Sequence, residues 1–578
     1  MINDRRQIQV VIALAVLSVV CVVHPNSCNA QQANHENFVD LSLLVAEEYP
    51  CTWPTGFPRF QIRHYLRIGA ESIYNSDILT IDGNTCTQID VPPHSIPRPG
   101  SELPNAGPLG LQYTDRTPAW RFVGEACVID IRDLLDVAPN GVSSLVRISH
   151  IQRWENAQRE LGPGDVALLR SDYGDKYFKP LPAGRRFISE PLEKKAPGWP
   201  DPDPDAMEYM AKKGVTAVGT DSPSMGPIPD LAEPTHYAGL KYGVVFTEGA
   251  TGLSQLPPTG SFYCSAGPRH ALGPYGECRA FAIKPGVLAD WLNIAARQKN
   301  VLDLSVVLST DLPVSWPGFG VGNHRHPYTK ADFLYAPNLD LYHHTHMMDS
   351  HAGTHLVPPS YALPEPGFRD REYSPRVRNW LREYEKKWGQ RGHSRVTTEQ
   401  VPLWQTCGWA RVIDVTAFVG TTSHDSWPRS AEIPVEAIQL HEADHGPLQP
   451  ADVVIFRTGH NDRTFKAAPD STTCIADPIN GVTEGWPAPG PAAINYLADR
   501  GIRCVGIDAP TLGGVEEQNA AMTYWALGTR GMVGVEFLIG VDRLPEKAYF
   551  IFAAVKIRGC HGGPGRALAL FQDVSQQK

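Results

Sequence analysis

Residues 38–54 read FVDLSLLVAEEYPCTWP, and residues 301–317 read VLDLSVVLSTDLPVSWP. Both stretches contain Asp-Leu-Ser, then a mainly apolar run, then Trp-Pro, so one unit of sequence occurs twice. Further segments match in the same order: DVALLR at 165–170 with DVVIFR at 452–457, and GTDSP at 219–223 with GIDAP at 506–510. Matches that keep their order across two halves indicate an internal duplication. The sequence therefore predicts two homologous domains.

The duplication also sets the expected boundaries. Each copy has about 250 residues, which is within the range of a single domain. We expect a first domain over residues 31–285, a linker helix over 286–300 and a second domain over 301–578. The second copy has gained residues mainly between 364 and 409. Within this insertion, the charged stretch 376–391 has apolar residues at helical spacing and predicts a surface helix.

The first 30 residues have the features of a secretory signal peptide. Arg5 and Arg6 precede an apolar run of about 14 residues, which is short of the roughly 20 that a membrane-spanning helix needs. Small residues at 26–30 then offer a cleavage site. We predict a signal peptide over residues 1–30, a secreted or lumenal location and no membrane span in the mature chain. An uncleaved signal anchor is the alternative.

The composition is that of a globular, loop-rich protein. The formal net charge of −10 gives no basic excess for nucleic acid, so we expect no nucleic-acid partner. Glycine and proline number 51 each, which argues against a bundle of long helices. Short β-branched runs such as 215–218 alternate with helical patterns such as 206–213, which ends at Gly214. The mixture predicts an α/β fold with a largely buried sheet in each copy.

Histidines are concentrated just before residue 356. His351 and His355 lie four residues apart around a Gly-Thr pair, a spacing at which two imidazoles can converge on one metal ion. The spacing alone does not distinguish a metal site from a polar loop. The neighbouring His343, His344 and His346 are expected to be solvated or to lie behind the ligands.

The second copy resembles the cyclase family, which includes bacterial kynurenine formamidase and isatin hydrolase. The string HAGTHLVPP at 351–359 is similar to the family signature H-x-G-T-H-x-D-x-P-x-H, and the D-L-S, W-P and G-I-D-x-P elements follow the family order. The resemblance covers each copy nearly end to end. It implies two swivelling β/β/α domains in tandem, metal-dependent hydrolysis and an internal pseudo-dimer, with a further homodimer of the whole chain left open.

The first copy keeps part of the family's site. Asp90 and His94 match the motif aspartate and the last motif histidine, whereas Asn84 and Gln88 replace the two earlier histidines. A divalent ion in a hydrolase needs about three protein ligands and an open position for water. The resemblance implies one Zn²⁺ or Mn²⁺ ion, with His94 as the catalytic proton shuttle. The candidate ligands in this copy are Gln88, Asp90, His236 and Glu248.

The second copy keeps a complementary part of the site. His351, His355 and Glu536 match family positions, but Val357 replaces the motif aspartate and Tyr524 replaces the later histidine. Because valine cannot coordinate a metal ion, the first copy is the better catalytic candidate. A catalytic site in the second copy remains the alternative.

These observations predict a secreted metal-dependent hydrolase that opens an amide, lactam or related C–N bond of a small molecule through its first domain. The alternative is a non-catalytic metal- or ligand-binding pseudoenzyme, in which both sites have decayed independently. His460, which follows a predicted strand end in the second copy, is a candidate pocket residue.

Overall fold

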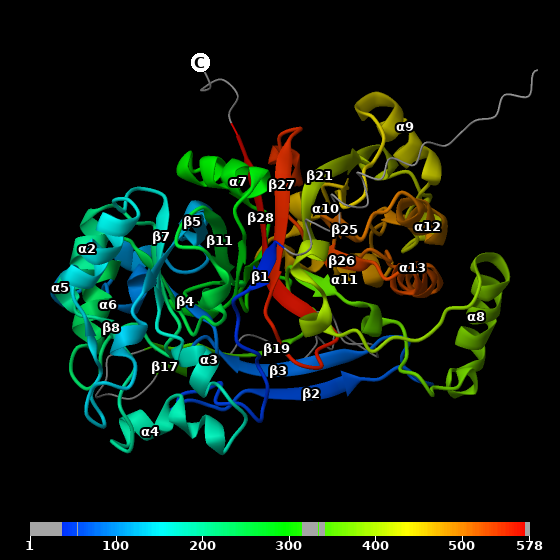
Figure 1. The fold of residues 1–578 in the computed structure, drawn as a ribbon. Coiled ribbons are helices and arrows are strands. Elements are labelled where there is room, and N and C mark those ends of the chain that lie inside the picture. Colours follow the sequence, from blue (N-terminus) through cyan, green and yellow to red (C-terminus); the bar gives the residue numbers. More distant parts are fainter. Residues whose placement is uncertain (1–36, 55, 315–332, 335–341, 573–578) are drawn as a thin grey trace, which may run out of the picture.

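The computed structural model describes residues 37–54, 56–314, 333–334 and 342–572. The predicted signal peptide over residues 1–30 lies outside this part of the chain. The described residues form two large mixed sheets with helices packed around them (Figure 1). The α/β prediction is therefore confirmed.

The first copy folds around a nine-stranded sheet. In spatial order its strands are β1 (Phe38–Asp40), β14 (Arg279–Ile283), β11 (Ser261–Ala266), β5 (Val123–Asp130), β7 (Asp165–Arg170), β9 (Ala217–Thr220), β10 (Val245–Glu248), β4 (Gln88–Asp90) and β13 (Tyr275–Glu277). The run from β5 to β10 is parallel and β4 is antiparallel to β10. These central strands are almost completely buried, as is typical of parallel strands covered on both faces.

Three helices lie on the outer side of this sheet, on the left of Figure 1: α2 (Ile148–Ala157), α5 (Pro204–Lys212) and α6 (Ala232–Leu240). Local sequence explains the limits of α5. The Asp203 carboxylate accepts a hydrogen bond from the Ala206 amide at 2.8 Å, and Pro204 occupies the first turn. Gly214, at a φ of 86°, follows the end of the helix.

The second copy repeats this plan around an eight-stranded sheet. In spatial order its strands are β15 (Val301–Asp303), β28 (Gly563–Phe571), β20 (His355–Val357), β26 (Val533–Glu536), β25 (Cys504–Ile507), β23 (Val453–Arg457), β21 (Cys407–Asp414) and β27 (Ala548–Ala554). The run from β21 to β26 is parallel, and β20 is antiparallel to β26. The order of parallel strands is therefore the same in both copies.

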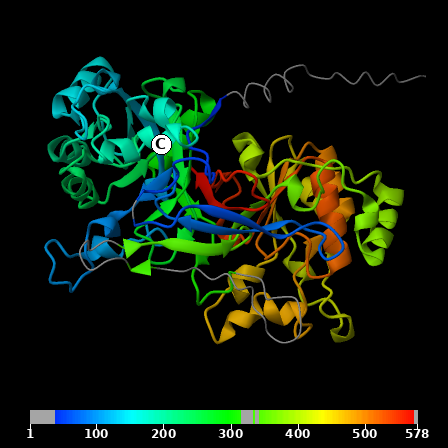
Figure 2. The same cartoon turned by 90° about the horizontal axis from the view of Figure 1, so that it is seen from below.

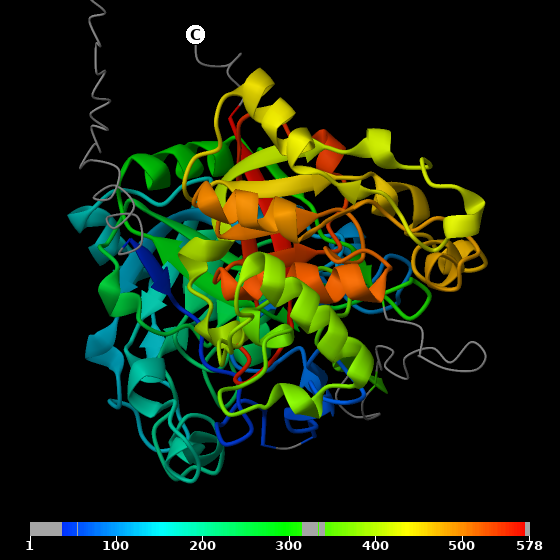
Figure 3. The ribbon, with the colours of Figure 1, turned by 90° about the vertical axis from the view of Figure 1, so that its right-hand side faces the viewer.

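Helices also cover the second sheet, as Figure 3 shows from the side: α8 (Pro375–Trp388), α9 (Val435–His445), α12 (Pro491–Asp499) and α13 (Glu517–Thr529). The helix predicted over 376–391 is confirmed as α8. Its buried residues Val377, Leu381 and Tyr384 recur at helical spacing on the side that contacts α13.

The remaining elements are short. They are β6 (Leu145–Val146) with β8 (Asp201–Pro202), β12 (Arg269–His270) with β16 (Val307–Leu308), β17 (Phe333–Leu334) with β18 (Tyr342–His343), β22 (Glu432–Ile433) with β24 (Ala488–Pro489), α3 (Tyr173–Tyr177), α4 (Ser189–Leu192), α10 (His460–Thr464) and α11 (Ala476–Ile479). Across the described ranges, no helix has both the length and the hydropathy needed to span a membrane.

A separate three-stranded sheet is built from both copies. β3 (Ser76–Asp82) pairs antiparallel with β2 (Gln61–Leu66) on one side and with β19 (Thr345–Asp349) on the other. Seen from below, these strands run from one half of the molecule to the other (Figure 2). The second copy is therefore hydrogen-bonded to a strand of the first.

The register of this pairing is symmetric. Thr345 lies opposite Asp82, and Asp349 lies opposite Ile78. The two motif copies are separated by 267 residues, so Thr345 is equivalent to Ile78 and Asp349 to Asp82. β3 and β19 are thus equivalent strands that pair about an approximate twofold axis.

A second pair of contacts obeys the same symmetry. His270 lies opposite Leu308, and an isolated bridge joins Val45 to Ile557. Val45 aligns with Leu308 and His270 with Ile557 in the duplicated sequence. Each copy therefore makes the same backbone contact with the other.

The two sheets share one hydrophobic core. α7 (Val287–Arg297) contacts β5 and β11 of the first sheet and β28 of the second. Its buried Leu292 belongs to a cluster that includes Phe262 of the first copy together with Ile551 and Leu568 of the second. Burial of apolar surface between the sheets stabilises the paired arrangement.

Candidate functional site

Adjacent elements bring the first-copy candidates together. β4 and β10 pair in a register that places Gln88 opposite Glu248, and a short 3₁₀ turn after β4 carries His94. His236 is supplied by α6, which contacts that turn. The predicted residues of this copy, separated by up to 160 positions in sequence, are therefore neighbours in space.

His236 lies between two carboxylates. Its Nε2 is 3.4 Å from Asp90 Oδ2 and 3.3 Å from Glu248 Oε1. Its Nδ1 lies 2.8 Å from the Ala232 carbonyl oxygen, and this contact orients the ring. The ring of His94 is 5.2 Å from that of His236, centroid to centroid. One ligand atom each from Asp90, His94 and His236 lies within 4.8 Å of the other two.

Glu248 is already hydrogen-bonded on both oxygens. Gln88 Nε2 donates to Glu248 Oε2 at 2.7 Å and to Asn84 Oδ1 at 3.0 Å, and the Met225 amide donates to Glu248 Oε1. Gln88 therefore acts as a donor in this arrangement. A ligand role for Gln88 would require its amide oxygen to replace the nitrogen at this position.

Asp90 contrasts with Glu248. Its side chain is fully buried, and neither carboxylate oxygen accepts a hydrogen bond. Burial, followed by the charge of Glu248, raises the pKa of Asp90 to about 7. A buried carboxylate without donors is costly. A cation next to Asp90 and His236 would compensate this cost, so the residues present fit a divalent metal ion.

The two histidines of this site titrate in opposite directions. Burial alone would lower the pKa of His236, but its close contacts with the negative charges of Asp90 and Glu248 raise it well above the usual range. Burial and the neighbouring His236 lower the pKa of His94 to about 3. His94 is therefore neutral at physiological pH and retains a lone pair that can accept a proton.

The second-copy site has a different arrangement. His355 Nε2 lies 3.1 Å from Glu536 Oε2. Tyr524 Oη donates to Glu536 Oε1 at 2.5 Å, and the Leu512 amide donates to the same oxygen at 2.7 Å. His351 turns its Nδ1 toward Asp349 Oδ1, at 3.2 Å. The second-copy acid is thus already satisfied by a phenol and a backbone amide.

A cavity of about 150 Å³ adjoins these residues. The ring of Tyr361 lies 4.7 Å from Tyr74 and 5.0 Å from Tyr524, and burial raises the pKa of all three phenols. Within the described ranges, three groups of His and acidic side chains have ligand atoms within 4.8 Å of one another, and His351, His355 and Glu536 are not one of them. The second copy offers an aromatic cavity next to a loosely grouped ligand set.

Three other histidines have surroundings that can be compared with those that the sequence predicts. His460 is buried, its Nε2 is 2.8 Å from the Cys474 carbonyl oxygen, and it does not line the second-copy cavity. His344 and His346 are 4% and 0% exposed, so of the two expectations for them, solvation or a place behind the ligands, solvation is excluded. His346 lies in β19 and His344 directly before it, and β19 pairs with β3 of the first copy. The side chain of His343 lies outside the described residues.

Two further groups were not anticipated from the sequence. One contains His64, Asp77 and His561, and the other contains His270, Glu277 and His346. Both groups combine residues from the two copies, so no local spacing could reveal them. The cross-strand pairing of His64 with Asp77 would have been the one accessible signal, had the register of β2 and β3 been known.

Comparison with known proteins gives a consistent picture. A family model described as "Putative cyclase" matches residues 39–227 and 302–513, once in each copy and together more than half of the chain. Kynurenine formamidase of Salinibacter ruber is 30% identical over 192 residues, which is 32% of this chain and 70% of the relative. Isatin hydrolase of Roseibium aggregatum is 33% identical over 141 residues, covering 23% of this chain and 51% of the relative.

Solved structures are similar at a lower level. Isatin hydrolase A of Ralstonia solanacearum has a TM-score of 0.36 at 21% identity, covering 45% of this chain and 96% of its own. Isatin hydrolase A of Labrenzia aggregata bound to benzyl benzoate has a TM-score of 0.34 at 23% identity, covering 47% of this chain and 94% of its own.

Proposed function

Because the chain belongs to the cyclase family, whose unit it contains twice, we propose that it is a metal-dependent hydrolase acting on a C–N bond of a small molecule through its first copy. The observation that carries this proposal is the buried Asp90 carboxylate, which has no hydrogen-bond donor and faces His236 at 3.4 Å. His94 is close enough to complete the group. At the equivalent positions of the second copy, all of which the structure describes, Val357 replaces the aspartate and Glu536 accepts hydrogen bonds from Tyr524 and the Leu512 amide.

The proposed metal ligands are Asp90, His236 and Glu248, whose Oε1 lies 3.3 Å from His236 Nε2. A divalent ion held by these residues would supply Lewis-acid chemistry, lowering the pKa of water and polarising a substrate carbonyl group. The chain itself keeps the ligands in place. The Ala232 carbonyl orients His236, and Gln88 fixes Glu248. We propose Zn²⁺ or Mn²⁺ as the resident ion, because nitrogen and carboxylate ligands suit both.

His94 is proposed to transfer the proton. Its neutral imidazole accepts the proton from water and delivers it to the leaving nitrogen, which must be protonated for the C–N bond to break. The ring is held by edge contacts with His236 at 5.2 Å and with Tyr275 at 5.1 Å. Tyr275 Oη in turn accepts a hydrogen bond from the His344 amide of the second copy at 3.2 Å. The second copy thereby supports the wall behind the proposed proton carrier.

The proposed substrates are a formamide of an aromatic amine or a small lactam. The names of the two relatives, kynurenine formamidase and isatin hydrolase, support these two classes. We propose that the second copy is a non-catalytic partner, because Tyr524 already occupies Glu536. The pairing of β3 with β19 supports the inference that the two copies form an internal pseudo-dimer.

Export of the protein is a separate proposal that rests on the sequence alone. N-terminal sequencing of the purified protein is expected to give a chain that starts near Gln31. An intact Met1 would refute export through a cleaved signal peptide.

The central experiment compares the two copies. Asp90→Asn and His236→Ala are expected to lose bound metal and hydrolysis of a panel containing aromatic formamides and isatin. His351→Ala and His355→Ala serve as matched controls and are expected to retain hydrolysis. If the first-copy variants keep full activity while His351→Ala abolishes it, the second copy holds the reaction centre and the proposal is wrong.

A further inference from the structure

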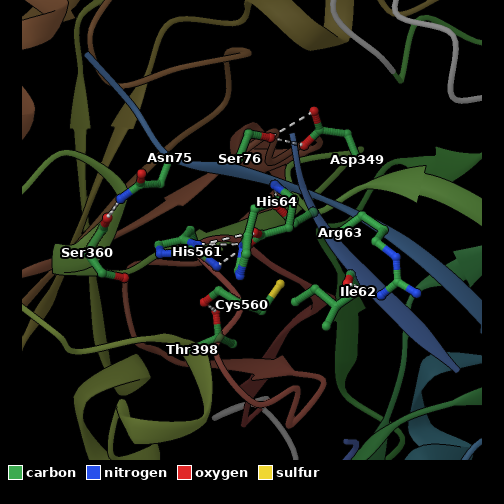
Figure 4. Close-up of polar contacts among 12 residues, drawn as sticks. Ile62, Arg63, His64, Asn75, Ser76, Asp349, Ser360, Thr398, Cys560 and His561 are labelled. Carbon is green, nitrogen blue, oxygen red and sulfur yellow. Dashed lines mark hydrogen bonds and ion pairs between the residues drawn. The ribbon is translucent and has the colours of Figure 1, made fainter. Parts of the chain in front are cut away.

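A second group of metal-ligand type lies where the two copies meet. His64 belongs to β2 and Asp77 to β3 of the first copy, whereas His561 precedes β28 of the second. Figure 4 shows the rings of His64 and His561 close together, reached from these two different parts of the chain. The group shares no residue with the first-copy site.

The imidazoles of His64 and His561 converge on the Asp77 carboxylate. His64 Nδ1 is 2.6 Å from Oδ1, and His561 Nδ1 is 3.0 Å from Oδ2 and 3.2 Å from Oδ1. Oδ2 also accepts a hydrogen bond from the His561 backbone amide at 2.7 Å, which fixes the carboxylate. One ligand atom from each residue lies within 4.8 Å of the other two. In a tetrahedral site with bonds of about 2.0–2.1 Å, neighbouring ligand atoms lie about 3.3 Å apart, so only small movements are needed.

The backbone fixes two of these positions. His64 and Asp77 lie directly opposite each other in the β2–β3 pair, so their side chains share one face of the sheet. On its other side, Asp77 exchanges hydrogen bonds with Ser350 of the second copy: its carbonyl accepts from the Ser350 amide at 2.9 Å, and its amide donates to Ser350 Oγ at 3.3 Å. The carboxylate is therefore held by contacts from both copies.

Two of the three side chains are buried and the third is partly exposed, an arrangement that suits a metal site reached from solvent. The side chain of Asp77 is 0% exposed and that of His561 is 6% exposed, but that of His64 is 41% exposed. Burial alone would raise the pKa of Asp77, but hydrogen bonds from His561 and His64 lower it well below its usual range, so the ligand is ionised. The exposed side of His64 gives an ion a route from solvent and leaves room for a water as fourth ligand.

We propose that His64, Asp77 and His561 bind a late first-row divalent ion such as Zn²⁺, separate from the first-copy centre, and that this ion fastens the two copies together. Two imidazoles and one carboxylate favour Zn²⁺, Cu²⁺ or Ni²⁺ over Mg²⁺ and Ca²⁺, which prefer oxygen ligands. The ion would join the β2–β3 hairpin to the segment before β28. Gly562, next to His561, lies so close to His351 that a Cβ would come within 2.8 Å of its ring. The site therefore also fixes one wall of the second-copy site.

The test uses the full chain, stripped with a chelator and reloaded with Zn²⁺ alone. Wild-type protein is expected to bind two ions. His64→Ala is expected to lower the Zn²⁺ affinity of one site by about 100-fold or more. Loss of a group that only hydrogen-bonds to a ligand lowers metal affinity by about 10–100-fold, and loss of a ligand itself should cost more. Because His64 is half exposed on an edge strand, this variant should fold. His424→Ala is the matched control, since His424 is exposed and belongs to none of the ligand groups among the described residues.

Two further measurements separate this proposal from the proposed function. Anomalous scattering at the zinc edge is expected to place an ion between the three side chains. Zn²⁺ should raise the Tm of wild-type protein and Asp90→Asn, and the part of the rise due to this site should be absent in His64→Ala. An ion found beside Asp90 with none at His64, or full two-ion binding by His64→Ala, would overturn the inference and leave the proposed hydrolase intact. If wild-type protein binds this ion but hydrolyses none of the substrates, only the proposed hydrolase function is refuted.

Discussion

Tyr524 Oη lies 2.5 Å from Glu536 Oε1, at the position where His236 faces Glu248 in the first copy. The substitution replaces the proposed metal ligand His236 by a hydrogen-bond donor that satisfies the acid directly. The two copies thus stabilise the same buried glutamate in different ways. In the first copy Gln88 and the Met225 amide donate to Glu248 while His236 faces it, whereas in the second copy Tyr524 and the Leu512 amide donate to Glu536.

The Tyr524 hydroxyl is expected to be important for stability. Tyr524→Phe removes one donor from Glu536, which is 2% exposed, so the free energy of unfolding should fall by about 1–3 kcal/mol. Tyr496→Phe is the matched control, because Tyr496 Oη also donates to a glutamate, Glu442, at 2.5 Å but at a position that is less buried than Glu536. Chemical denaturation of both variants measures the difference. Equal losses would contradict the burial argument.

Metal affinity at the first-copy site should depend on pH. The pKa of Asp90 is raised to about 7, and a proton on its carboxylate competes with the ion. Affinity is therefore expected to fall by about tenfold for each pH unit below 7 because of the Asp90 proton alone. Because the pKa of His236 is also raised, the affinity should continue to rise above pH 7. Competition with a chelating dye at pH 6, 7 and 8 checks this, using His64→Ala to isolate the site. Constant affinity over this range would show that Asp90 is not a ligand.

His94 is predicted to affect turnover more than metal binding. His94→Gln keeps a polar side chain but removes the proton carrier, so kcat should fall by about 10²–10⁴-fold while the first-copy ion is retained. Metal analysis and steady-state kinetics on the same preparation separate the two effects. Loss of the ion together with activity would instead identify His94 as a ligand, a position compatible with its grouping with Asp90 and His236.

A duplicated arginine is expected to hold the copies together. Arg566 pairs with Asp303 at 2.6 Å and donates to the Thr114 carbonyl of the first copy at 2.9 Å, and its side chain is 0% exposed. Arg566→Ala leaves Asp303 without this partner and should cost about 3–5 kcal/mol of unfolding free energy. Arg132→Ala breaks an exposed pair with Asp130 and should lower the free energy of unfolding far less than Arg566→Ala does. Comparable losses of unfolding free energy in the two variants would mean that burial does not decide how much an ion pair contributes to stability.

The same arrangement occurs in the first copy, which makes the prediction symmetric. Arg279 pairs with Asp40 at 2.9 Å and donates to the Ala554 carbonyl of the second copy at 3.3 Å. Arg279→Ala should therefore destabilise the chain in the same way as Arg566→Ala.

Much of this protein could be predicted from the sequence because the deciding signals are local or repeated. The duplicated Asp-Leu-Ser segments identified two copies, β-branched runs between glycines identified the parallel strands, and the motif around Asp90 identified the first-copy candidates. Gln88 shows the limit of such reasoning. Its identity allowed a ligand role, but the contact between its amide nitrogen and Glu248 depends on the pairing of β4 with β10.

Only the tertiary structure decided how the two copies meet. The antiparallel pairing of β3 with β19 buries His344 and His346, although the sequence left solvent exposure open for both. The same packing brings His561 to Asp77, 484 residues away. Such contacts depend on the relative placement of two folded copies, which is set by the shared core and the approximate twofold symmetry. Periodicity and spacing describe one segment at a time, so they carry no information about that placement.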